Sequence, residues 1–351
     1  MSTILYSQSN LPTLQNRVFK TVQQAENCPL GDIEIVEDYE TGLVYNASFN
    51  PELVVYDSDY DNEQAVSPAF QEHLQSVADL IETELGLTGL IEVGCGKGFF
   101  LELLLQRNFD ITGFDPTYQG SNPRIIKELF RPGLLGAARG LILRHVLEHI
   151  QNPVDFLLQL AEANGGGGLI YIEVPCFDWI CERKAWFDIF YEHVNYFRIS
   201  DFRNMFSRLL FAEKTFSGQY ISVVADLSSL RKPQFSKENS VTFPEDFLES
   251  LPTKGSLEGD DKMVAVWGGG SKGVIFSVIN RRVGNAIDLV VDVNPRKHGK
   301  FLPISGLLVS SPSEANEKLP AGATVYVMNS NYLEEIREMT NNRFNYLAVD
   351  A

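Results

Sequence analysis

The chain has 351 residues, and 44% of them are apolar, which is enough for two or three domains that each bury a core. Its 29 basic residues against 46 acidic ones give a formal net charge of −17. This charge argues against binding to nucleic acid or to an anionic membrane, and apolar runs such as 140–143 and 289–291 are far too short to span a bilayer.

The amino terminus and the cysteines indicate a cytoplasmic, soluble protein. The first residues, MSTILYSQSNLP, lack the cationic start and the long apolar run of a secretory signal peptide. The four cysteines include no CxxC pair and suggest no disulfide framework.

Residues 1–65 predict a small N-terminal domain that is irregular or β-rich, because short apolar runs are broken by Pro, Gly and Asn. From Pro68 to Leu85, apolar residues recur every three or four positions, which predicts a helix. Residues 90–106 then predict a strand, a glycine turn and a second helix. Further strands are predicted at 111–115, 140–146 and 168–175, with a helix at about 153–163. This alternation predicts a domain of residues 66–227, built on a parallel sheet with helices on both faces.

The polar, proline-punctuated stretch 228–260 predicts a linker, with one short helix near 244–251. A second alternating block fills residues 261–351, with strands at 263–268, 286–294 and 324–329 and helices at 272–280 and from 332 onward. The fold class is therefore α/β, with two Rossmann-like domains in tandem behind a small N-terminal domain.

The first glycine turn, Glu92-Val-Gly94-Cys-Gly96-Lys-Gly98, follows a strand and opens a helix. Glycines let a ligand approach the backbone, and the helix N-terminus offers free N–H groups. Asp115 ends the next strand, where an acid can accept hydrogen bonds from both ribose hydroxyls. Glu92 distinguishes the turn from the dinucleotide-binding form.

The segments IEVGCGKGFFLELL, GFDPTYQG, LRHVLEHIQNPVDFL and IYIEVP together resemble class I S-adenosylmethionine-dependent methyltransferases, over about residues 68–227. The resemblance implies that Gly94, Gly96 and Gly98 line the methionine part of S-adenosylmethionine beside Glu92. It also implies that Asp115 binds the ribose, and that Arg144 and His145 flank the cofactor.

The second turn, Gly268-Gly-Gly270-Ser-Lys-Gly273, is a formal G-x-G-x-x-G, and Asp292 ends the next strand. The fingerprint alone indicates NAD binding. VWGGGSKGVIFSVI and VVDVNPRKHGKFLPISGLLVSSP, however, resemble the C-terminal domain of sugar C-methyltransferases, which act on nucleotide-linked keto-sugars. The resemblance implies a substrate-side or structural role for this domain, and NAD or another nucleotide remains an alternative.

The segment FYEHVNYF, residues 190–197, places an acid and an imidazole among aromatic rings. The same family carries a Tyr-His-Glu-His run here, of which Glu192 and His193 match, while Tyr191 keeps a hydroxyl displaced by one position. Methylation of carbon needs an enolate, so His193 is the candidate base and Glu192 its partner, with Tyr191 and His145 as further catalytic candidates. A purely structural role for the pair is the alternative.

No metal is expected. His145-Val-Leu-Glu148-His149 matches the H-x-x-E-H signature, but the preceding residues favour a strand and Pro153 follows closely. Sugar C-methyltransferases usually carry an N-terminal zinc domain with paired cysteines. This N-terminal segment keeps only Cys28, too few ligands for a tetrahedral site.

The sequence therefore predicts an S-adenosylmethionine-dependent C-methyltransferase whose small-molecule substrate is a nucleotide-activated keto-sugar. Two alternatives stay open: an O- or N-methyltransferase of another small metabolite, and a non-catalytic scaffold that binds the cofactor.

Overall fold

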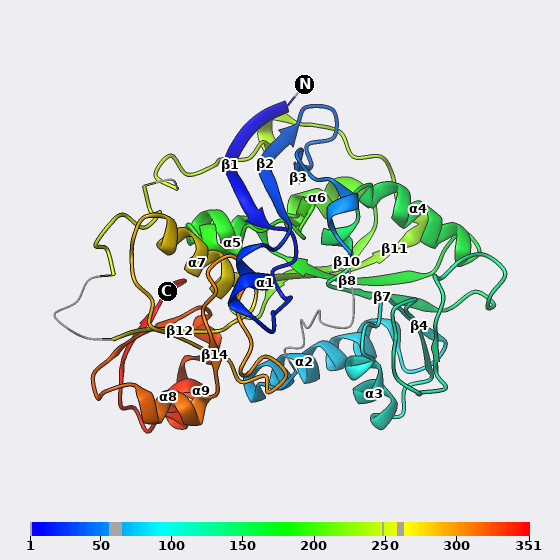
Figure 1. Cartoon of the computed structure of the whole chain (residues 1–351). Coiled ribbons are helices and arrows are strands. Elements are labelled where there is room, and N and C mark those ends of the chain that lie inside the picture. Colours follow the sequence, from blue (N-terminus) through cyan, green and yellow to red (C-terminus); the bar gives the residue numbers. More distant parts are fainter. Residues whose placement is uncertain (1, 56–64, 248, 258–262) are drawn as a thin grey trace.

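The computed structural model describes residues 2–55, 65–247, 249–257 and 263–351. Within these residues the chain forms three sheets, which we call the N-terminal, central and C-terminal sheets (Figure 1). The central and C-terminal sheets carry helices and parallel strands, so the predicted α/β class is confirmed. The predicted domain borders near 65 and 260 adjoin residues 56–64 and 258–262, which lie outside the described part.

The N-terminal sheet is antiparallel and has the order β1-β2-β3-β9. Its last strand comes from the middle of the chain, where Tyr196 pairs with Val44 and Asn195 with Tyr45. A short helix, α1, connects β1 and β2. The bounds are β1 Ser2–Pro12, α1 Val22–Glu26, β2 Leu30–Asp38, β3 Val44–Asn46 and β9 Asn195–Tyr196.

The central sheet has the order β10-β11-β8-β7-β4-β5-β6 and is parallel apart from β11, which runs antiparallel to both neighbours. Successive side chains of each strand point to opposite faces of the sheet, so both faces are apolar and both are covered by helices. Leu141 and Leu143 of β7 join the core beneath α4, α5 and α6, whereas Ile142 joins the core of α2 and α3 (Figure 1). The bounds are α2 Pro68–Leu85, β4 Leu90–Val93, α3 Phe99–Gln106, β5 Ile111–Phe114, β6 Ile125–Ile126, β7 Gly140–Arg144, α4 Pro153–Ala163, β8 Leu169–Pro175, α5 Phe177–Glu182, α6 Ile199–Met205, β10 Leu209–Thr215 and β11 Tyr220–Asp226.

The C-terminal sheet is parallel and has the order β14-β13-β12-β15-β16. Its central strand, β12, is buried throughout and leads through the second glycine turn into α7. The bounds are β12 Val264–Trp267, α7 Ser271–Arg282, β13 Leu289–Val291, β14 Val309–Ser310, α8 Pro312–Lys318, β15 Thr324–Val327, α9 Leu333–Met339 and β16 Asn345–Ala348.

Two local predictions were wrong. The described residues of 244–251 form turns rather than a helix, because the fully buried Phe247 packs edge-on against Tyr6, with the ring centroids 5.4 Å apart. The strand predicted at 286–294 is limited to β13, and Asp292, directly after it, turns its carboxylate to the second glycine turn. In the described part of the chain, no helix combines the length and apolar character needed to cross a membrane.

Candidate active site

The first glycine turn connects β4 to α3 and is held by Asp115, directly after β5. One oxygen of Asp115 accepts the Gly96 N–H at 2.8 Å, and the other accepts the backbone and hydroxyl donors of Thr117 at 2.8 and 2.7 Å. Gly94 and Gly96 both have positive φ, at 74° and 54°. A Cβ on Gly94 would come within 2.5 Å of Val146, whereas nothing lies within 4 Å of a Cβ on Gly96. The turn therefore leaves open space at Gly96, where a ligand can approach the backbone.

Glu92 lies in β4 just before this turn and is only 3% exposed. Burial raises the pKa of its carboxyl group to about 7, against the opposing pull of Arg144. Its Oε2 accepts no hydrogen bond from the described residues. A buried, unsatisfied carboxylate oxygen beside the turn suits a cationic ligand.

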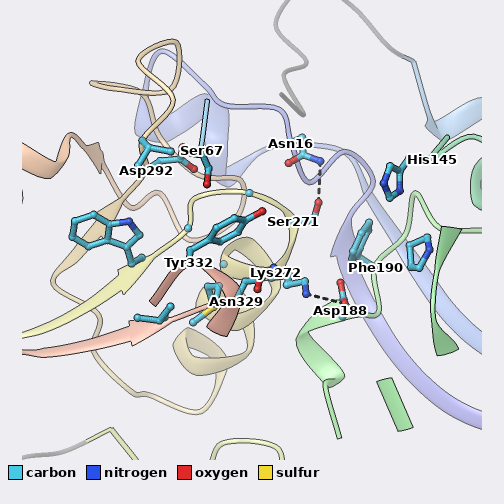
Figure 2. Close-up of a pocket in the computed structure, with 18 of the residues that line it drawn as sticks. Asn16, Ser67, His145, Asp188, Phe190, Ser271, Lys272, Asp292, Asn329 and Tyr332 are labelled. Carbon is cyan, nitrogen blue, oxygen red and sulfur yellow. Dashed lines mark hydrogen bonds and ion pairs between the residues drawn. The ribbon is translucent and has the colours of Figure 1, made fainter. Parts of the chain in front are cut away.

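A cavity of about 230 Å³ lies between the central and C-terminal sheets (Figure 2). The ends of β7 and β8 contribute His145 and Pro175, and the loop before β9 contributes Phe190 and His193. The opposite wall is the second glycine turn with Asp292. Figure 2 shows His145 and Phe190 at one end of the cavity and Asp292 at the other. Two predicted site regions, far apart in the sequence, thus face one space.

Two of the three histidines that line the cavity, His145 and His193, differ in charge. Burial alone would lower the pKa of His145, but Glu148 and Glu173 outweigh it and raise that pKa to about 9. His145 also adopts a positive φ of 50°, which turns its ring into the cavity wall. Burial lowers the pKa of His193 well below its usual value, and the nearby His149, His145 and Lys272 act in the same direction. At neutral pH, His145 is therefore an imidazolium and His193 a neutral imidazole.

The predicted partners of His193 face away from the cavity. Glu192 is 1% exposed, and its Oε2 accepts the Gln15 N–H at 2.8 Å. Tyr191 is fully buried, and its hydroxyl accepts the Asn50 N–H at 2.8 Å. Neither residue lines the cavity, where Phe190 stands beside His193 with the ring centroids 3.9 Å apart. The contacts of Glu192 and Tyr191 tie the loop to the N-terminal segment, at residues that follow β1 and β3.

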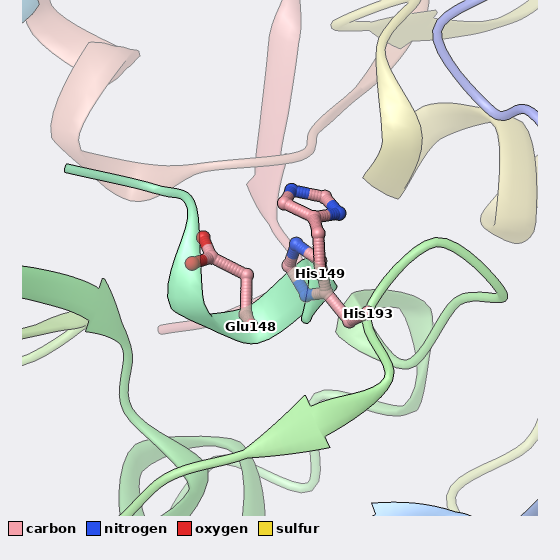
Figure 3. A group of neighbouring side chains, drawn as sticks. All are labelled: Glu148, His149 and His193. Atoms are coloured by element: carbon pink, nitrogen blue, oxygen red, sulfur yellow. The ribbon is translucent and has the colours of Figure 1, made fainter. Parts of the chain in front are cut away.

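Glu148, His149 and His193 come together at the cavity edge (Figure 3). One donor atom from each lies within 4.8 Å of the other two, a grouping that could hold a metal ion. His149 Nδ1 is 2.8 Å from the Glu192 carbonyl oxygen, and Glu148 Oε1 is 3.3 Å from His145 Nδ1. The positive charge of His145 competes with any metal for this carboxylate, and the absence of a metal stays a prediction.

Behind His145, the fully buried carboxylate of Glu173 is surrounded by donors. Arg144 lies 2.8 Å from its Oε1, and His73 and the Tyr171 hydroxyl each lie 3.0 Å from its Oε2. Arg144, together with contacts from His145 and His73, outweighs burial and holds the pKa of Glu173 well below its usual value. Arg144 pairs with Glu173 and lies over the ring of Phe100, 4.4 Å from its centroid, and its place beside the cofactor stays a prediction.

The second glycine turn has the same device as the first. Asp292, directly after β13, accepts the Gly269 N–H at 2.8 Å. Lys297 lies 3.5 Å from this carboxylate and also lines the cavity. The N-terminus of α7, at Gly270, has no side-chain cap and forms part of the cavity wall. An uncapped helix N-terminus beside a lysine is suited to an anion.

Sequence reasoning missed Glu173 and His73. Both carried a signal: Glu173 is the acid in the otherwise apolar strand LIYIEVP, and His73 lies on the apolar face of α2 beside Phe70 and Leu74. A titratable residue at a core position indicates a buried partner. Only the fold shows that the two are partners of each other.

A family model described as a methyltransferase domain matches residues 58–211. The protein is an S-adenosylmethionine-dependent methyltransferase. A second model, described as a C-methyltransferase C-terminal domain, matches residues 242–345 of this methyltransferase. No curated protein matches the sequence.

Several solved structures resemble part of this methyltransferase. A protein from Pyrococcus horikoshii is 13% identical, with a TM-score of 0.38 over 49% of this chain and 99% of its own. An S-adenosylmethionine-dependent methyltransferase from Aquifex aeolicus is 15% identical, with a TM-score of 0.36 over 47% and 95%. Magnesium protoporphyrin IX methyltransferase from Synechocystis is 16% identical, with a TM-score of 0.32 over 45% and 78%. Because these TM-scores are below 0.5, the assignment rests on the family models.

Proposed function

We propose that this methyltransferase methylates the carbon next to the ketone of a nucleotide-activated keto-sugar. The observation that carries the proposal is the cavity in which a neutral His193 and a positively charged His145 face the same space. Histidines whose pKa values are pushed apart in one cavity are suited to separate base and acid roles. The match of residues 242–345 to a C-methyltransferase domain supports carbon as the methylated atom.

The cofactor is assigned to the first glycine turn. Asp115 would accept hydrogen bonds from the ribose hydroxyls, and the open side of Gly96 leaves room for the methionine part. Glu92 would face the cationic amino acid portion, where its unsatisfied oxygen gains a partner. When bound, S-adenosylmethionine supplies an electrophilic methyl group.

The cavity residues would prepare the acceptor. His193 takes the proton from the carbon next to the ketone, which leaves an enolate. His145 holds its positive charge toward the developing oxyanion and stabilises it. His193 keeps the proton, and the enolate carbon is the atom that would receive the methyl group.

The second glycine turn would hold the nucleotide part of the acceptor. Lys297 and the N-terminus of α7 favour a phosphate. Asp292 has the position of an acid that binds a ribose in nucleotide-binding folds. This leaves the sugar between the turn and the histidines.

Deuterium exchange tests the proposal. In deuterated water, with S-adenosylhomocysteine in place of the methyl donor, the enzyme should exchange the proton next to the ketone of a nucleotide-linked keto-sugar. An O- or N-methyltransferase has no chemical reason to cleave this C–H bond. A protein that binds S-adenosylhomocysteine but exchanges no such proton, across a panel of keto-sugars, would contradict carbon methylation.

A further inference from the structure

Imidazoles and carboxylates alternate along a buried chain that begins in the cavity. The chain is His193, Glu148, His145, Glu173 and His73. Nitrogen and oxygen donor atoms of His193 and Glu148 lie within 4.8 Å, a gap that one water can bridge. His145 is 3.3 Å from Glu148 through Nδ1 and 3.0 Å from Glu173 Oε1 through Nε2. His73 Nε2 is 3.0 Å from Glu173 Oε2. Every member thus lies within reach of the next.

The far end of the chain lies at a second opening. His73 lines a surface groove with Glu72, Ser76, Thr215 and Ser222, between α2 and the β10–β11 hairpin. Glu72 and Ser76 are exposed, so the groove meets solvent. Glu173 has no exposed surface and joins the wall of the cavity to the wall of the groove.

The proposed function leaves one proton on His193 after each methyl transfer. While products fill the cavity, His193 is shielded, since only 7% of its surface is exposed even without them. We propose that the chain from His193 to His73 conducts this proton to the groove, so that the base is regenerated while the cavity remains closed. This inference rests on the proposed function, although the path would serve any methyl transfer that releases a proton.

Each step moves a single proton and balances. His145 is an imidazolium at rest, so it first gives its Nε2 proton to Oε1 of Glu173, and the neutral ring then turns over to bring the bare Nε2 to Glu148. Nε2 takes the proton that Glu148 received from His193 through a bridging water, which restores the imidazolium. The carboxyl group of Glu173 turns about its terminal C–C bond and gives the proton to His73, which releases it into the groove.

The rest of the site fits this path. Glu173 is ionised at rest, because Arg144 and its other donors stabilise the carboxylate, so it can accept a proton only in passing. The contacts of His145 with Glu148 and Glu173 are close ion pairs rather than aligned hydrogen bonds, so turning the ring over breaks no aligned hydrogen bond. His73 does not touch the reacting atoms and acts through His145.

The first test needs no acceptor. In enzyme saturated with S-adenosylhomocysteine, NMR of ¹⁵N-labelled histidine measures how fast the His145 Nε2 proton exchanges with solvent. His73→Gln keeps a donor toward Glu173 but cannot carry a proton, so exchange should slow by at least about tenfold. Free imidazole, which can enter the groove, should restore it. Glu72→Gln changes the same groove outside the chain and is the matched control.

The second test uses turnover. His73→Gln should lower kcat, leave the acceptor KM and cofactor affinity unchanged, and respond to added imidazole. Exchange at the wild-type rate in a folded His73→Gln protein would overturn the path, and loss of activity that imidazole does not restore would do the same. If this variant does not fold, His73→Asn is held to the same predictions. If His73→Gln slows the His145 exchange as expected but the wild-type enzyme exchanges no ketone-adjacent proton, the proposed function is contradicted and the path is not.

Discussion

At the scale of single residues, the decisive feature is that two imidazoles in one cavity are held in opposite charge states. His145 lies between two carboxylates, and His193 lies near other positive groups and an aromatic ring. Burial of His193 and the carboxylates beside His145 therefore separate two chemically identical side chains into a base and an acid.

His193→Gln should lower turnover by roughly 10²–10⁴-fold, the range for losing a general base. Affinity for S-adenosylhomocysteine should not change, because His193 lies in the cavity wall away from the first glycine turn. Rapid-quench kinetics with calorimetry separates the two effects. His149→Gln is the control, because its ring bonds the Glu192 carbonyl at the cavity edge. If His193→Gln kept full activity and full exchange of the proton next to the ketone, the role of this histidine would be structural.

Activity should depend on the charge of His145. With a pKa raised to about 9, the imidazolium is present below that pH and is lost as the pH rises through it. The ion pairs contribute stability that is fully present below the ordinary pKa of about 6.5 and is lost as the pH rises from there through about 9. We therefore expect the melting temperature to fall from about pH 6.5 to 9, and kcat/KM to fall from about pH 8 to 10. Glu148→Gln removes one carboxylate and should move the fall in kcat/KM to lower pH. If the pH profile of this variant is unchanged, the fall in kcat/KM belongs to another group.

Cofactor binding should release protons near neutral pH. Burial raises the pKa of Glu92 to about 7, so about half of the molecules carry its proton at pH 7. A cationic ligand stabilises the carboxylate and lowers that pKa. Calorimetry of S-adenosylmethionine binding, in buffers of different ionisation enthalpy, should find release of up to about half a proton, absent in Glu92→Gln. Equal release in that variant would place the cation elsewhere.

At the scale of elements, one arrangement occurs twice: a strand, a glycine turn, a helix, and an acid at the end of the next strand. In both copies the acid accepts a backbone N–H of the turn: Asp115 accepts the Gly96 N–H, and Asp292 accepts the Gly269 N–H. The acid thus fixes the shape of the turn before any ligand binds. This preorganisation lowers the free-energy cost of ordering the loop when a ligand binds.

Asp115→Ala should weaken S-adenosylhomocysteine binding by about 1–3 kcal/mol, the scale of losing hydrogen bonds to a charged group. Part of the loss comes from the turn, which loses the bond to Gly96. Asp110→Ala, at the other end of β5, removes an exposed ion pair with Arg124 and should leave affinity unchanged. Equal affinities for the two variants, by calorimetry, would move the ribose contact away from β5.

The same turns show what the sequence could reveal. Glycines, a following helix and an acid at fixed spacing are local signals, and both turns lie where the pattern predicted them. The chain from His193 to His73 draws on four separate segments, and no spacing along the sequence brings Glu173 to His73. The directions of Glu192 and Tyr191 also depend on contacts with residues 15 and 50, far away in sequence.

At the scale of the whole molecule, the cavity exists only because the central and C-terminal sheets are held together. Lys272 of α7 pairs with Asp188 at 3.1 Å and lies over the ring of Trp179, 4.9 Å from its centroid. The wall that would hold the nucleotide is thereby fixed against the wall that carries the histidines.

Elemental analysis of protein purified without chelator should find much less than one zinc per chain. Cys28 has no partner cysteine in the N-terminal segment, and at the cavity edge the imidazolium of His145 competes for Glu148. One zinc per chain that is lost in both His149→Gln and His193→Gln would make the cluster of Figure 3 a metal centre. His193 would then be a ligand instead of a base.

The strand β9 has a consequence for how the enzyme can be divided. It follows His193 directly and pairs with β3, while the next residue, Phe197, bridges to Cys176 beside the central sheet. The loop that carries His193 is thus anchored to both the N-terminal and the central sheet. A truncated chain that starts at residue 66 keeps the central and C-terminal sheets but loses one of these anchors. Such a chain should bind the cofactor normally yet have an untethered His193, so an engineered swap between relatives would have to transfer residues 1–46 together with 190–197.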